Sequence, residues 1–335
     1  MKWVLVFIIV AVSIQLFVFQ IVHDETIDSD LNLSELQAKY DLDAGTASSG
    51  ADSEEVYFPY GINLDKYTHE NKDLSRHTKY TFTQNGKEVD VIEDYDISDI
   101  YDGDMDKDGV REMIFKTYSG GVHCCSDLYI ARFTREMKKP LKIPLNNLDA
   151  IKFKDLDGDG IQEWIMYDDQ YSYFLTCFAC SPYVKIVATY KEGKLILRPK
   201  LTKKHMADDL EKLSAARISL SERGYLHVTQ AFTPVMNHFL YHFYSGDTDK
   251  ALGVIDQYLI FEGRGVKLLF LKALFESMSE SYFWDQLRKI NRLYEVNGFD
   301  GSLEYYDADT VSAYLFEKLE LLKSKRDKST HEKEK

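Results

Sequence analysis

Three different hydrophobic patterns follow one another along the chain. Residues 3–22 form one nearly continuous apolar run. From about residue 57 to 203, β-branched and aromatic residues are punctuated by turn signals such as Asn85-Gly86 and Gly193, a pattern typical of short antiparallel strands. From residue 204 onward, apolar residues recur at helical spacing. The order predicts an apolar leader, a β-rich domain and a helical domain.

These patterns predict an α+β fold class. About 20 apolar residues are long enough to cross a bilayer as a helix, and no small-residue cleavage site follows the run at residues 3–22. Lys2 before it and Asp24 with Glu25 after it place the amino terminus in the cytoplasm. The expected location is therefore the inner membrane, single-pass, with the bulk of the chain periplasmic or otherwise extracytoplasmic.

Five segments are expected. They are a transmembrane signal anchor (1–22), an acidic linker (23–56), a β-rich domain (57–203), an all-α domain of helical hairpins (204–322) and a charged tail (323–335). The chain carries 41 basic and 55 acidic residues, a formal net charge of −14. This excess of negative charge argues against nucleic acid as a partner.

An acidic, glycine-containing stretch occurs twice in the β-rich segment. Residues 104–112 read D-M-D-K-D-G-V-R-E, and residues 155–163 read D-L-D-G-D-G-I-Q-E. Carboxylates at alternate positions of a tight turn converge on one centre, and an all-oxygen set suits calcium better than zinc or copper. An EF-hand loop needs Glu at its twelfth position, where the two copies have Phe115 and Met166. The repeat predicts two calcium loops of another kind.

The two loops resemble the calcium-binding hairpins of FG-GAP and VCBS repeats, found in integrin-type propellers and secreted bacterial proteins. The ninth position is usually Asp in that family and is Glu here, and two copies are fewer than the blades of a full propeller. The resemblance implies a small β domain that binds two Ca²⁺ ions. The implied ligands are Asp104, Asp106, Asp108, Glu112 and the carbonyl of Val110 for one ion, and Asp155, Asp157, Asp159, Glu163 and the carbonyl of Ile161 for the other.

Four cysteines lie in the middle of the chain: Cys124, Cys125, Cys177 and Cys180. In the predicted oxidising compartment they are expected to form disulfides between the two repeats, Cys124 with Cys180 and Cys125 with Cys177 or the other cross pairing. A bridge between Cys124 and Cys125 is a third option. The alternatives are a zinc site formed by the cysteines and His123, a redox-active C-x-x-C pair at Cys177–Cys180, or a cysteine nucleophile with His123 as its base.

The helical region contains one recognisable hairpin. Residues 239–261 resemble a single tetratricopeptide-type helix pair, with Gly246 at the turn, although no fixed repeat period follows. A further helix is expected over residues 206–218. Both a helical bundle and a short solenoid fit these patterns.

The leading hypothesis is a non-enzymatic, membrane-anchored, extracytoplasmic calcium-binding protein that binds another envelope protein or a cell-wall polymer. One alternative is a periplasmic inhibitor or immunity protein against a cell-wall hydrolase, a role that similar small calcium-loop domains serve in some bacteria. The other is a hydrolase or thiol enzyme that uses His123 and the cysteines. Acidic pairs such as Asp168-Asp169 look like solvated charge.

Overall fold

A computed structural model describes residues 52–70, 76–121, 124–213, 217–220, 231–293, 315–321 and 324. The chain divides into two compact units, residues 1–50 and 51–335, and only the second contains described residues. The predicted anchor (1–22), nearly all of the acidic linker and nearly all of the charged tail therefore lie outside the described part.

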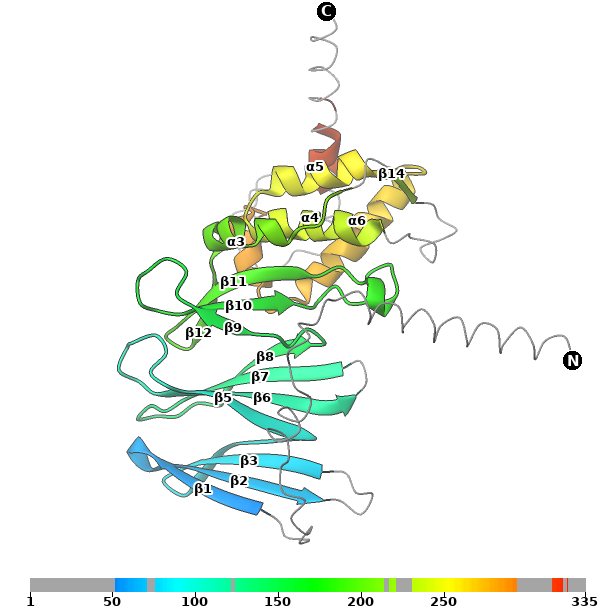
Figure 1. Ribbon diagram of the computed structural model, residues 1–335. Helices are drawn as coiled ribbons and strands as arrows, with labels where there is room; N and C mark the ends of the chain where they lie inside the picture. The colour runs from blue at the N-terminus through cyan, green and yellow to red at the C-terminus, as the bar shows by residue number, and fades with distance from the viewer. Residues whose placement is uncertain are drawn as a thin grey trace, which may run out of the picture. The chain divides into compact units, whose positions relative to one another are not determined.

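Three four-stranded antiparallel sheets follow one another in chain order (Figure 1). In each sheet every strand pairs with the next strand of the sequence. The first sheet contains β1 (Asp52–Phe58), β2 (Ile62–Glu70), β3 (Arg76–Gln84) and β4 (Lys87–Asp94). The second contains β5 (Asp96–Gly103), β6 (Glu112–Gly121), β7 (Cys124–Arg132) and β8 (Leu141–Asn146). The third contains β9 (Lys152–Lys154), β10 (Glu163–Asp168), β11 (Val184–Lys191) and β12 (Lys194–Leu197).

Two tight turns lie where the sequence predicts them. Asn85 and Gly86 join β3 to β4 with φ angles of 52° and 73°, and Glu192 and Gly193 join β11 to β12 with φ angles of 49° and 80°. Positive φ at both central residues matches the right-handed twist of a two-residue hairpin. These local signals set the register of the first and third sheets.

The second sheet is buried on both faces. Alternate residues of β6 point to opposite faces, and Ile114 belongs to a core shared with the third sheet, whereas Phe115 belongs to a core shared with the first. Both side chains are fully buried. The consecutive apolar residues of β6 are therefore explained by packing against a neighbouring sheet on each face.

The helices share buried hydrophobic cores with the third sheet. They are α3 (Pro199–His205), α4 (Phe232–Tyr244), α5 (Thr248–Tyr258), α6 (Arg264–Ser279) and α7 (Trp284–Ile290), and residues 315–321 are also helical. Trp164 and Ile186 of the third sheet belong to the same core as Phe239 of α4 and Phe270 of α6. Gly246, at φ 76°, makes the turn between α4 and α5, where the sequence places it.

The predicted fold class is wrong in two respects. The described residues contain 14 strands in four sheets, so the structure is dominated by sheets, and the region after residue 204 is not all-α. Of the helix predicted over residues 206–218, the described residues 206–213 form only a short 3₁₀ turn (Ala207–Asp209), and β13 (Ile218–Leu220) pairs in parallel with β14 (Leu259–Phe261). This pairing buries Ile218, Leu220 and Leu259 in the core, which outweighs the helical spacing of the segment.

The described residues do not bear out the predicted single-pass location in the inner membrane, whose anchor (1–22) lies outside the described part. In the part of the chain that the structure describes, no helix is both long enough and apolar enough to cross a bilayer. The longest α-helix there, α6, has 16 residues, against about 20 for a bilayer crossing.

A buried carboxyl connects the third sheet to the helices. Asp168, the last residue of β10, accepts hydrogen bonds from the Tyr244 hydroxyl of α4 and the Ser281 hydroxyl that follows α6. Tyr171 is hydrogen-bonded to the Tyr244 hydroxyl at 3.1 Å. Burial raises the pKa of the Asp168 carboxyl above its ordinary value, and the Ser281 and Tyr244 hydroxyls act in the opposite direction. Asp168 is thus a structural group and not solvated charge.

We expect Asp168 to make the protein less stable as the pH rises. Its pKa is higher in the folded state than in the unfolded state, so the folded protein binds more protons between the two values. The free energy of unfolding should therefore fall by about 1.4 kcal/mol per pH unit across that interval. Urea unfolding of the wild type and of Asp168→Asn over a pH series tests this, because the variant lacks the titrating group. Parallel stability curves above pH 4 would contradict the prediction.

Candidate metal centre

Both acidic loops occupy the same position in their sheets. Residues 104–111 join β5 to β6, and residues 155–162 join β9 to β10, so each loop connects the first strand of a sheet to the second. The sequence predicts that each repeat joins two strands, and the structure agrees. Lys107 Nζ lies so close to Gly160 that a Cβ atom at Gly160 would be 2.8 Å away from it. The two loops are therefore neighbours.

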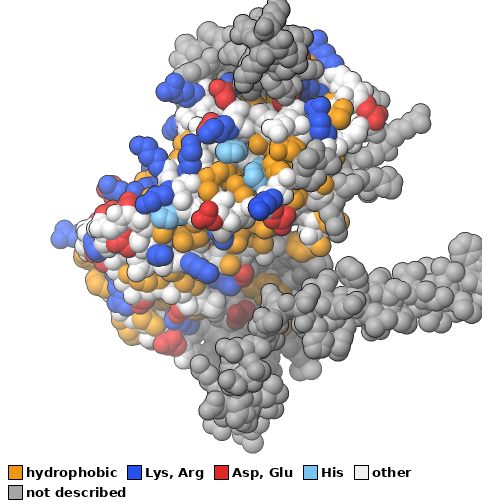
Figure 2. Space-filling model, turned by 45° about the horizontal axis from the view of Figure 1, so that its top comes forward, with side chains coloured by type: hydrophobic (Ala, Val, Ile, Leu, Met, Phe, Trp, Pro, Cys, Tyr) orange, Lys and Arg blue, Asp and Glu red, His pale blue; other side chains and the backbone are white. Residues whose placement is uncertain are grey.

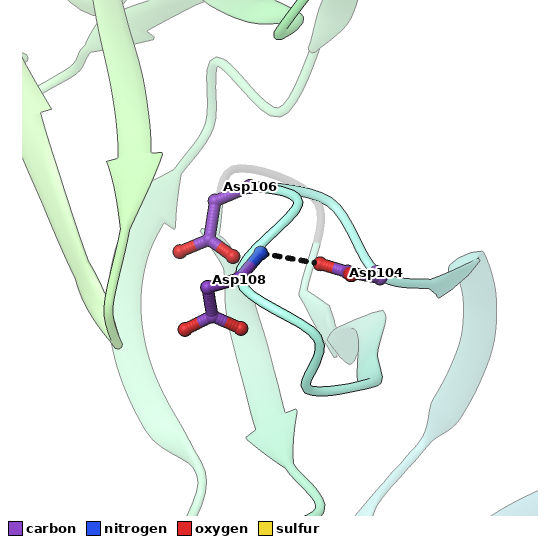
Figure 3. Close-up of side chains that lie close together, drawn as sticks. All are labelled: Asp104, Asp106 and Asp108. Carbon is purple, nitrogen blue, oxygen red and sulfur yellow. Dashed lines mark hydrogen bonds between the residues drawn. The ribbon is translucent and has the colours of Figure 1, made fainter.

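Backbone amides hold the first loop in shape (Figure 3). Asp104 accepts hydrogen bonds from the amides of Asp108 at 3.1 Å and Gly109 at 2.9 Å. Asp108 accepts one from the amide of Val110 at 2.9 Å. Gly109 has a φ of 86°, which a residue with a side chain adopts only with strain. The glycine and the two carboxylates together fix the bend.

Asp106 is the unusual member of the first loop. It is only 8% exposed, and its Oδ2 accepts a hydrogen bond from the amide of Glu192, in the β11–β12 turn, at 2.6 Å. Its other oxygen, Oδ1, is buried without a hydrogen-bond partner among the described residues. Figure 3 shows its carboxylate beside that of Asp108. A buried carboxylate oxygen without a partner is costly, so this position calls for a positive group.

Glu112, at the ninth position, is a fully buried anchor of the same loop. It accepts hydrogen bonds from the amide of Met105 at 3.1 Å and from Arg132 Nε at 3.1 Å. Arg132 lies opposite Glu112 in the β6–β7 register and also pairs with Asp108. Burial raises the pKa of the Glu112 carboxyl to about 7; the Met105 amide lowers it, and the Asp106 and Asp104 carboxylates raise it. The loop thus concentrates more negative charge than one arginine offsets.

The second loop repeats most of this arrangement. Asp155 accepts hydrogen bonds from the amides of Gly158 at 2.6 Å and Gly160 at 3.0 Å. Buried Glu163 accepts one from the amide of Leu156 at 2.8 Å and one from Arg198 Nη1 at 3.4 Å. The amide of Ile161 donates to Asp159 at 2.8 Å, as the amide of Val110 does to Asp108. One arginine contact differs, because Arg198 Nη2 donates to Asp157 at the third position, at 2.6 Å, whereas Arg132 pairs with Asp108 at the fifth. The sequence match is therefore accompanied by four matching hydrogen bonds, from Gly109 and Gly160, Val110 and Ile161, Met105 and Leu156, and Arg132 and Arg198.

Among the described residues, two groups of carboxylates could hold a metal ion. They are Asp104, Asp106 and Asp108 in the first loop and Asp155, Asp157 and Glu163 in the second, each with ligand atoms within 4.8 Å of one another. Oxygens that bind one metal ion at about 2.5 Å are separated by at most about 5 Å, so each group is compact enough to hold a metal ion.

Six of the predicted carboxylate ligands are thus brought together. Glu112 and Asp159 are not members of these groups, and the carbonyls of Val110 and Ile161 stay predictions. Sequence reasoning missed both arginines. Arg132 and Arg198 come from strand ends distant in sequence from the loops, and no motif spacing connects them to Glu112 and Glu163.

The predicted bridges between the cysteine pairs do not form in the structure. Cys177 and Cys180 are free thiols, whereas Cys125 is disulfide-bonded. A hydrogen bond with Cys180 lowers the pKa of the Cys177 thiol. The segment after β10 forms a 3₁₀ turn (Phe178–Cys180) and not a strand, so Cys177 and Cys180 are not presented on opposite faces of a sheet. His123 and the side chain of Cys124 lie outside the described part.

Comparison with known proteins found no matching protein family, no matching curated relative and no matching solved structure.

Proposed function

We propose that the chain is a non-enzymatic calcium-binding protein whose two loops each hold one Ca²⁺ ion. The ions would neutralise the carboxylates at the edge where the second and third sheets meet, and would thereby stabilise the stacked sheets as a binding surface for another protein. The proposal agrees with the likeness of the loops to FG-GAP and VCBS hairpins.

The observation that carries the proposal is the buried, unpartnered oxygen of Asp106 beside two further carboxylates. A bound cation would supply its missing partner. Since Asp106 also accepts the amide of Glu192, the same ion would strengthen the contact between the second and third sheets. Calcium is favoured over magnesium because it tolerates six to eight oxygen ligands in irregular geometry, whereas Mg²⁺ requires a near-ideal octahedron.

Calcium is expected to bind the purified protein and to raise its melting temperature. At a free concentration 100 times the Kd, one site adds about 2.7 kcal/mol to the free energy of unfolding, which corresponds to a Tm increase of roughly 5–10 °C in a unit of this size. Titration calorimetry with CaCl₂ and with MgCl₂, and melting curves in calcium and in chelator, test this. Absence of heat at millimolar calcium together with identical melting curves would refute the proposal.

The loop carboxylates bond to backbone amides and arginines and do not present a reacting group, so the loops are proposed to shape a binding surface and not to catalyse a reaction. The proposed partner of this surface is another protein. Capture of proteins from cell extract by the immobilised chain, in calcium and in chelator, provides the test. A specific partner should be retained only in calcium, and it should be lost with Asp106→Asn in the same buffer. Retention that is the same under all conditions would argue against an ion-dependent surface.

A further inference from the structure

A cavity of about 510 Å³ lies between the second and third sheets, beside the first acidic loop. Its walls come from the end of β7, the segment 134–142 that leads into β8, and the β11–β12 turn. Glu192 is part of this turn and donates its amide to Asp106. The volume falls within the range of small-molecule sites.

The cavity is basic although the chain as a whole carries a net charge of −14. Lys and Arg side chains also gather along the left edge of the face shown in Figure 2. Five basic and two acidic side chains line the cavity; the basic ones are Arg132, Lys138, Lys139, Lys142 and Lys194. A cluster of positive charge in an acidic protein favours an anionic ligand.

Three of these five cations already have partners. Lys139 pairs with Asp90 at 2.9 Å, Lys142 with Asp127 at 2.7 Å, and Arg132 with the first acidic loop. Lys138 and Lys194 are exposed and form no ion pair within the described part of the chain. They approach the cavity from different sheets, so an anion between them would receive charged donors from two sides.

Two further features favour a ligand with an organic part. Tyr190 lines the cavity with an aromatic side chain that is 1% exposed. Ile130, Pro140 and Leu141 add apolar wall beside the lysines. A phosphate monoester matches this combination, because its dianionic group suits lysine donors and its organic group suits the apolar wall.

We propose that this cavity binds the phosphoryl group of a phosphate monoester between Lys138 and Lys194. This site is separate from the proposed calcium loops, although Arg132 touches both. Its test is therefore run in chelator, where cation binding does not contribute, and its failure leaves the proposed calcium function unaffected.

Titration calorimetry with phenyl phosphate, inorganic phosphate and phenol tests the proposal. Phenyl phosphate should bind to the wild type more tightly than phenol. Because hydrogen bonds from ammonium groups to a phosphoryl group are charge-assisted and strong, Lys138→Gln/Lys194→Gln should weaken phenyl phosphate binding at least tenfold. The matched control is Lys152→Gln/Lys154→Gln, which removes the same charge from two exposed lysines of β9 outside the cavity.

The outcomes separate the possible ligands. Tighter binding of phenyl phosphate than of inorganic phosphate supports an ester, and equal affinities support the same phosphoryl site with free phosphate as its ligand. No binding of either phosphate, equal affinity for phenol and phenyl phosphate, or equal losses in the two double variants would overturn the proposal. Melting curves of both variants establish that each is folded.

Discussion

Replacing Asp106 with asparagine is expected to weaken calcium binding at the first loop by at least about tenfold, since changes even to groups outside the ligand shell of a metal site commonly cost 10–100-fold. Asparagine keeps an oxygen that accepts the amide of Glu192, but it removes the negative charge of a carboxylate buried beside Asp104 and Asp108. The stoichiometry measured by calorimetry should fall from two ions to one under conditions that saturate the second loop.

The effect of Asp106→Asn on the stability of the protein should depend on whether calcium is present. Three carboxylates with oxygens within 4.8 Å of one another repel each other without a cation. In chelator, Asp106→Asn should therefore be at least as stable as the wild type, and only in calcium should it be less stable. Asp102→Asn is the matched control, because Asp102 is paired with Arg111 and does not belong to the carboxylate group. Equal destabilisation of Asp106→Asn in both buffers would indicate a structural role for Asp106 without an ion.

Local sequence signals predicted the loops and turns correctly for a physical reason. A positive φ is inexpensive only for glycine and asparagine, so Asn85-Gly86 and the glycines of the acidic loops restrict the backbone without help from the rest of the chain. The carboxylates at the first and fifth positions then bond to amides within five residues. These contacts depend only on the spacing of the aspartates and glycines along the chain, which can be read directly from the sequence.

The role of the ninth position could not be predicted in the same way. Glu112 and Glu163 are both fully buried, and each is held by an arginine from another part of the chain. In the second sheet that arginine lies directly opposite the glutamate in register. In the third sheet the opposite residue is Thr189, and Arg198 reaches Glu163 from beyond β12. The first pairing follows from strand register, which is set by the packing of whole sheets, and the second follows from the path of the chain after β12.

The helix prediction for residues 206–218 was wrong for a similar reason. Helical spacing over residues 206–218 describes only where apolar side chains recur along the chain. In the structure Ile218 and Leu220 are buried because β13 lies beside β14, a segment that follows α5 much later in the sequence. A three-residue parallel pair leaves no periodic signal, and its stability comes from tertiary burial.

Replacing Phe115 with alanine is expected to lower the free energy of unfolding by about 3–5 kcal/mol, the usual cost of truncating a buried phenylalanine. Phe115 is fully buried between the first and second sheets. Its ring stacks on Tyr129 at 5.3 Å within its own sheet and meets Tyr80 at 5.2 Å and Phe82 at 6.0 Å in the first sheet. The cavity left by alanine would remove contacts on both sides.

Urea unfolding measures this loss, and Tyr57→Ala serves as the control because Tyr57 is 71% exposed and should change stability by no more than about 0.5 kcal/mol. The shape of the transition carries further information. Because Phe115 joins two sheets in one core, its loss should leave the first sheet without support, and the sheet should then unfold at a lower urea concentration than the rest. A variant whose fluorescence and circular dichroism transitions coincide with those of the wild type would show that the sheets do not depend on this contact.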